Sequence, residues 1–140
     1  MSAPLCRFAC FSLLMVGLAG CGSDGPFDYV PVSGRLTYDD GTPIPAAGIM
    51  LQFVAQDAPL VEGAHPRPAT ANLDETGSFS CATSHKYGDG LIPGKHKVAV
   101  FYAVDAAGRS LVPQEYTHVS NSPLVVDTAA APLEIHVPRP

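Results

Sequence analysis

Hydrophobic residues in this chain recur mainly at every second position, in short runs separated by Gly, Pro, Asp and Ser. In one run Ile49, Leu51 and Phe53 share a face, which is the pattern of a half-buried β-strand. No helical period is long enough to predict a helix after the first two dozen residues. The predicted strands are residues 30–38, 49–56, 69–73, 78–83, 95–104, 124–126 and 133–137.

The connections between these runs refine the prediction. Residues 74–77 form a tight turn whose Gly77 can adopt positive φ, so residues 78–83 are expected to return as the second arm of a hairpin. Residues 105–121 are ambiguous, and within them residues 111–116 could form a short edge strand interrupted by Pro113. Six or seven strands at this spacing predict an all-β fold, a single antiparallel Greek-key β-sandwich, with a small barrel as the alternative.

The first residues have a different pattern. Arg7 precedes an apolar run from Phe8 to Leu18, and small residues precede Cys21. This is the layout of a secretory signal peptide, and the run is too short for the roughly 20 apolar residues of an uncleaved membrane helix, which is the alternative. The segment resembles a bacterial lipoprotein signal with its lipobox. The resemblance implies cleavage after residue 20, a lipid on Cys21 and, because Gly22 follows, an outer membrane rather than an inner one.

Three segments are therefore expected: a signal peptide (1–20), a lipidated Cys21 with a flexible tether (21–29), and one β-domain (30–140). Removal of the leader from 140 residues leaves 120, enough for one core. Of the eight basic residues Arg7 is lost, so seven face thirteen acidic ones and the net charge is −6. Without a basic cluster, nucleic acid is excluded as a partner.

The cysteines do not predict a disulfide. Cys6 and Cys10 leave with the leader and Cys21 is expected to carry lipid, so Cys81 is left alone. Strand alternation puts Cys81 on the face of Phe79, which predicts a small apolar core residue. A reactive or dimer-forming thiol is the alternative.

Four motifs, each a turn followed by a strand, occur in order at residues 32–45, 74–79, 90–98 and 112–117. Together they resemble the carboxypeptidase regulatory-like, or transthyretin-like, β-sandwich domains found in small bacterial lipoproteins, and the resemblance covers roughly residues 30–138. The resemblance implies a transthyretin-like or Ig-like sandwich and says almost nothing about function.

Candidate chemistry is sparse. Motifs of hydrolases, metalloproteases and phosphate-binding loops are absent from the sequence, so no enzyme is predicted and no cofactor is expected. Ser84, His85 and Asp89 are close in sequence, but a triad is defined by geometry. In an antiparallel sandwich alternate loops emerge at opposite ends, so loops 57–68 and 84–94 should share the end where the tether enters. The candidate ligand set there, suited to zinc, is His65, His85, Asp89, Asp57 and Glu62.

The opposite end is expected to gather carboxylates that could hold Ca²⁺, although turn chemistry also accounts for them. These candidates are Asp39, Asp40, Asp74, Glu75 and Asp105. His96 and His136 are expected on solvated faces. Loop residues Tyr87, Tyr116 and His118 are candidate contact residues, and a sugar-stacking surface is conceivable although the chain has no Trp.

These observations favour a non-catalytic β-sandwich lipoprotein in the cell envelope, held to the membrane through Cys21, with a structural or protein-interaction role. Envelope proteins are its expected partners. The alternatives are a small-ligand module for carbohydrate or a divalent metal and, less favoured, an envelope hydrolase with a catalytic group of perturbed pKa in a cleft.

Overall fold

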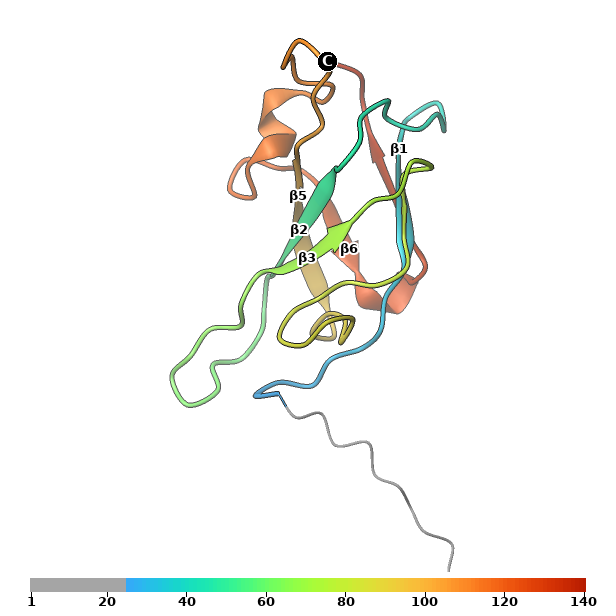
Figure 1. Cartoon of the computed structure of the whole chain (residues 1–140). Coiled ribbons are helices and arrows are strands. Elements are labelled where there is room, and N and C mark those ends of the chain that lie inside the picture. Colours follow the sequence, from blue (N-terminus) through green and yellow to red (C-terminus); the bar gives the residue numbers. More distant parts are fainter. Residues whose placement is uncertain (1–24) are drawn as a thin grey trace, which may run out of the picture.

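Two β-sheets pack face to face in the computed structural model, which describes residues 25–140 (Figure 1). Seven strands and two 3₁₀ helices follow one another along this part of the chain. They are β1 (Gly34–Tyr38), β2 (Met50–Ala55), β3 (Ala69–Asn72), β4 (Ser78–Phe79), β5 (Lys95–Phe101), η1 (Gln114–Thr117), β6 (Val125–Asp127), η2 (Thr128–Ala130) and β7 (Leu133–Val137). The all-β sandwich prediction is confirmed.

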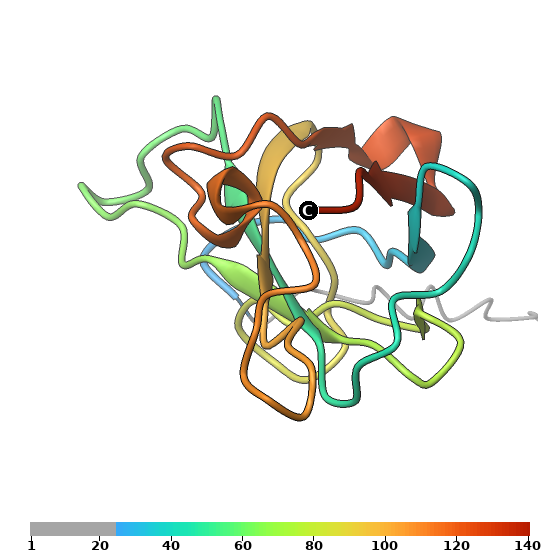
Figure 2. The same cartoon turned by 90° about the horizontal axis from the view of Figure 1, so that it is seen from above.

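One sheet has the order β4-β1-β7 and the other β3-β2-β5-β6, and the two layers are seen from above in Figure 2. β2 pairs with β5 and β1 with β7, so both sheets join strands that are distant in sequence. Four of the five pairs are antiparallel, whereas β1 and β7 are parallel, which corrects a purely antiparallel prediction. η2 carries the chain from β6 to the other sheet, and there β7 lies beside β1 and runs in the same direction.

The core lies between the sheets and is made by alternate residues of their inner faces. Leu36 of β1, Leu51 of β2 and Val98 of β5 are fully buried. The Phe53 and Phe79 rings meet across the layers with centroids 6.0 Å apart. Burial of these apolar side chains is the main force that holds the two sheets together.

The predicted hairpin at residues 74–77 is only half correct. The turn exists, since the Gly77 amide donates to the Asp74 carbonyl and Gly77 has φ 80°. Its two arms, however, belong to different sheets, because β3 pairs with β2 while β4 pairs with β1. Phe79 packs into the core against Phe53, and this draws the second arm away from β3.

Other strand predictions need shorter bounds. The first strand starts at Gly34 rather than at residue 30, and Val30 forms only an isolated bridge to Leu91. β5 ends at Phe101 rather than at residue 104, so Tyr102 lies outside the strand. Residues 111–116 form no strand, and η1 begins at Gln114 instead.

The two ends of the sandwich carry different loops. The described chain enters at Gly25 beside loops 57–68 and 84–94, which together define the entry end, as the alternation of loops predicts (Figure 1). The far end carries the turns after β1, β3 and β5 and the C-terminus. Within residues 25–140 no helix has the length and apolar character needed to cross a membrane.

Candidate functional site

A notch opens at the edge of the sandwich where β3 and the segment after β4 separate and rejoin. Thr70 and Thr83 exchange two backbone hydrogen bonds, of 2.9 and 2.8 Å. At the other side the Asp74 amide donates to the Ser78 carbonyl at 2.9 Å. Between these two closures β4 is paired with β1 in the other sheet, so the chain leaves β3 and a gap results.

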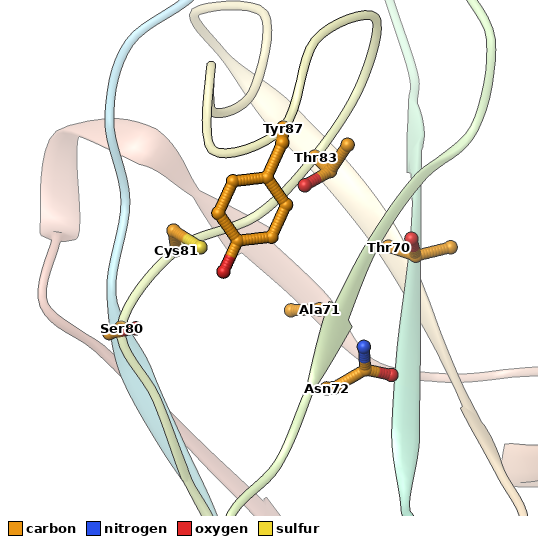
Figure 3. A pocket seen from close by; sticks show the side chains of 7 residues that line it. All are labelled: Thr70, Ala71, Asn72, Ser80, Cys81, Thr83 and Tyr87. Atoms are coloured by element: carbon orange, nitrogen blue, oxygen red, sulfur yellow. The ribbon is translucent and has the colours of Figure 1, made fainter.

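The notch has a volume of about 310 Å³. Its lining includes hydroxyl, amide, phenol and thiol groups but no Asp, Glu, Lys, Arg or His side chain. Figure 3 shows the Tyr87 ring standing over the notch, with its hydroxyl directed towards the space between Cys81 and Ala71. The lining residues are Thr70, Ala71, Asn72, Ser80, Cys81, Thr83 and Tyr87.

Several polar groups of the notch have no partner within residues 25–140. The Asn72 amide, the Ser80 hydroxyl and the Tyr87 hydroxyl make no hydrogen bond there, and Tyr87 is 90% exposed. Thr83 differs, because its Oγ1 accepts from the Gly88 amide at 3.0 Å. The backbone of Asn72 also faces the notch, since Thr70, two residues earlier on β3, directs its backbone groups to Thr83.

Cys81 lies in the notch rather than in the core, which corrects the prediction from strand alternation. The regular strand ends at Phe79, so the period of two no longer holds at residue 81. Ala82 is fully buried in its place, while Cys81 is half-buried and is a free thiol. Alternation locates core residues only as far as strand pairing continues, and the sequence gives no sign of where β4 stops.

Asp89 organises the loop that carries Tyr87. Its carboxylate accepts from the backbone amides of Ser84, His85 and Lys86 at 2.7, 2.9 and 2.8 Å. Partial burial raises the pKa of Asp89, but these three donors outweigh that effect and hold the pKa below its ordinary value. The Ser84 hydroxyl donates to the Gly90 carbonyl at 2.6 Å. The Asp89 carboxylate and the Ser84 hydroxyl thus bond to backbone groups, and they do not form a triad with the His85 side chain.

His65 and His85 are brought together as predicted, since both line a cavity of about 210 Å³ at the entry end. Phe27, Tyr29 and Arg67 share that lining, whereas Asp89 does not. The pKa of Tyr29 is raised, mainly by partial burial of the side chain and to a smaller extent by the nearby negative charge of Asp89. Among residues 25–140 no group of three or more His, Cys, Asp or Glu side chains could hold a metal ion, so the zinc prediction gains no support here.

The acidic residues of the far end do not converge on one site, and two of them are engaged in separate hydrogen bonds. The Asp40 carboxylate accepts from the Thr42 side chain and backbone and from Arg139, which lowers the pKa of Asp40 to about 2. Asp74 accepts from Thr76 and Ser78, and these bonds lower its pKa. Asp39 and Glu75 are exposed. In the described part of the chain, no group of three or more carboxylate, His or Cys side chains at this end could hold a calcium ion.

His96 is buried, with 3% of its surface exposed, so the prediction of a solvated side chain is wrong. Its Nδ1 lies 3.2 Å from the Gly94 carbonyl. Burial lowers the pKa of His96, although the Gly94 contact and Asp127 act in the opposite direction. His136 is exposed as predicted, with Nδ1 2.9 Å from the Thr37 hydroxyl.

The sequence predicted neither the notch nor the exposed position of Tyr102 at the far end. Tyr102 follows the last residue of β5, has φ 63°, and is 64% exposed. Val104 beside it is 45% exposed, while Ala103 between them is buried. Positive φ at Tyr102 turns its side chain outward and lets Ala103 return to the core, an arrangement that no turn residue in the sequence indicates.

Searches of protein-family models, of curated proteins and of solved structures find no match to this chain.

Proposed function

We propose that this protein is a lipid-anchored, non-catalytic β-sandwich of the cell envelope that acts by binding a protein partner. The proposal combines the lipoprotein signal around Cys21, the resemblance to carboxypeptidase regulatory-like domains, and the exposed side chains at the far end. It makes the entry end the membrane-proximal face and the far end the face presented to partners.

The anchoring part of the proposal is supported by the position of Cys21, which lies outside the described residues. Four residue steps separate Cys21 from Gly25, so the extended chain spans at most about 14 Å. A lipid on Cys21 would keep the entry end close to the bilayer, and two or three acyl chains would make release rare. The Gly22 that follows Cys21 favours the outer membrane as its location.

The observation that carries the binding role is Tyr102. A non-glycine residue in the left-handed region costs about 1–2 kcal/mol, and such strain tends to occur at functional positions. Here the strain presents an aromatic ring to solvent next to Val104. Exposed tyrosines in a fixed conformation are typical anchor residues of protein interfaces.

The loop that follows Tyr102 is well ordered by hydrogen bonds. The Asp105 amide donates to the Arg109 carbonyl, and the Asp105 carboxylate accepts from the Ala107 and Arg109 amides at 2.9 Å each. Arg109 also donates its Nε to Asp105 at 2.8 Å. A rigid surface loses less conformational freedom on binding, which favours recognition by a partner.

Site-specific cross-linking tests this proposal. A photo-reactive amino acid at Tyr102, introduced into the anchored full chain in cells, is expected to capture a defined envelope protein. Val125 on β6, which is 52% exposed, provides the matched control position. Equal capture from both positions, or no capture from position 102, would contradict a binding surface at Tyr102.

The notch supports a second candidate function, a small-ligand module. Its lining is polar and uncharged, which suits a neutral ligand rather than a divalent metal. The two functions are compatible, because the notch lies at the sheet edge and Tyr102 at the far end.

A further inference from the structure

We propose that the notch binds a single ring of a neutral saccharide, with the Tyr87 ring against one face of the sugar and the Asn72 and Ser80 side chains bonded to its hydroxyl groups. This site extends the second candidate function and does not depend on the binding surface at Tyr102.

The shape of the notch limits what can enter. The backbone bonds between Thr70 and Thr83 close one side, and the Asp74–Ser78 bond closes the other. An extended peptide that adds a strand to β3 would have to displace the Thr70–Thr83 pair. The volume of about 310 Å³ is at the lower limit of small-molecule pockets, roughly 300–1,000 Å³. A ligand of one ring therefore fits these limits, and a strand does not.

The chemistry of the lining selects a neutral polar ligand. A phosphate, carboxylate or ammonium group would meet no opposite charge in the notch, because no lining side chain is acidic, basic or a histidine. The side chains of Asn72 and Ser80 and the Tyr87 hydroxyl supply both donors and acceptors. Their lack of partners within the described chain leaves them available. Neighbouring hydroxyl groups of a sugar, which also donate and accept, match this set.

Tyr87 supplies the apolar part of the site. The loop holds it over the notch through the Gly88–Thr83 bond and the three amides bound by Asp89 (Figure 3). Tyr87 as a whole is nevertheless 90% exposed, so it contributes little to the core. Aromatic rings present an apolar face with a polar tip, which is what the C–H face and the hydroxyl rim of a sugar ring require.

The test is a titration of the ¹⁵N-labelled full chain in detergent micelles, followed by amide chemical shifts. The probes are glucose, galactose and N-acetylglucosamine, with sorbitol as an acyclic polyol control. At least one cyclic probe is expected to change the amide chemical shifts of residues 70–72 and 80–88 in a saturable manner. Sorbitol is expected to have no effect on them. The absence of such shifts from all three sugars up to about 100 mM, or equal shifts with sorbitol, would overturn the proposal.

Variants identify the notch as the site. Tyr87→Ala is expected to weaken binding about fivefold or more through loss of ring contact, whereas Tyr87→Phe should retain most of the affinity. Val125→Ala removes an exposed hydrophobic side chain of β6, at the opposite edge of the sheet from β3, and should leave the affinity unchanged. Unchanged affinity in Tyr87→Ala would refute the site even if a sugar binds.

Cys81 provides an independent measurement in the same protein. Because its half-buried thiol lines the notch, an occupying sugar should slow alkylation of Cys81, measured on its own peptide by mass spectrometry. Alkylation at the same rate with and without a saturating sugar would show that the sugar binds elsewhere and would overturn the assignment. Failure of this site would leave the cross-linking result at Tyr102 unaffected.

Discussion

Gly90 lies where the N-terminal segment meets loop 84–94. It has φ 102°, and a Cβ there would overlap the Val30 carbonyl. That carbonyl accepts from Leu91 at 3.0 Å, while the Val30 amide donates to Leu91 at 2.8 Å. A glycine is therefore required for both its conformation and its lack of a side chain, and this single position fixes how the chain enters the domain.

Substitution of Gly90 should thus be more costly than substitution of a glycine that only turns the chain. Gly41 has a similar φ of 82°, but a Cβ there would have nothing within 4 Å. We expect Gly41→Ala to lower the free energy of unfolding by about 1–2 kcal/mol, and Gly90→Ala by roughly twice as much. Urea unfolding of both variants checks this, and equal losses would mean that the Val30 contact is not tight.

His96 makes stability depend on pH. Its pKa is lowered in the folded protein, while the unfolded chain has a value near 6.5. Below about pH 6.5 the unfolded chain therefore binds a proton that the folded protein does not. The free energy of unfolding then decreases as the pH is lowered, by at most about 1.4 kcal/mol per pH unit. The carboxylates whose pKa is lowered, such as Asp40, lose their contribution only at more acidic pH.

His96→Gln should flatten this dependence, because glutamine does not titrate. Urea unfolding at pH 7.5, 6.5 and 5.5 is expected to show wild-type stability that falls and variant stability that changes less. Parallel curves for the two proteins would show that His96 is not the group responsible.

At the scale of elements, the loop between β4 and β5 depends on one carboxylate. Asp89→Ala removes the acceptor for three amides, and we expect a loss of about 1 kcal/mol because the loop is partly exposed. Amide hydrogen exchange should rise at residues 84–86 while the strands stay protected. Unchanged exchange in this loop would show that Asp89 does not hold it.

Some strands and loops could be predicted from the sequence and others could not. Alternation locates β2 and β7 closely, because one face of each strand is buried in the core, through Leu51 and Phe53 in β2 and through alternate residues along β7. It fails after Phe79, where the pairing of β4 with β1 ends and Cys81 leaves the core. Loop parity correctly predicted that the loops of His65 and His85 share the entry end, where both residues line one cavity. The notch itself could not be predicted, since it arises from the separation of two segments that the sequence presents as a hairpin.

In the proposed orientation of the whole molecule, the entry end faces the membrane, Tyr102 lies at the far end, and the notch lies at the edge between β3 and β4. This orientation depends on attachment next to Gly25. If the chain were free in solution, neither end would have a fixed direction, and the far end would have no special access to envelope partners.

The acyl state of Cys21 therefore decides whether the proposed membrane anchor exists. Mass spectrometry of the mature N-terminus, with membrane fractionation, should find an acylated Cys21 as the first residue and the protein in the membrane fraction. Cys21→Ser should abolish the lipid and the processing that depends on it. A wild-type protein that lacks lipid, or a Cys21→Ser variant that is still lipid-labelled and processed in the same way, would contradict the account.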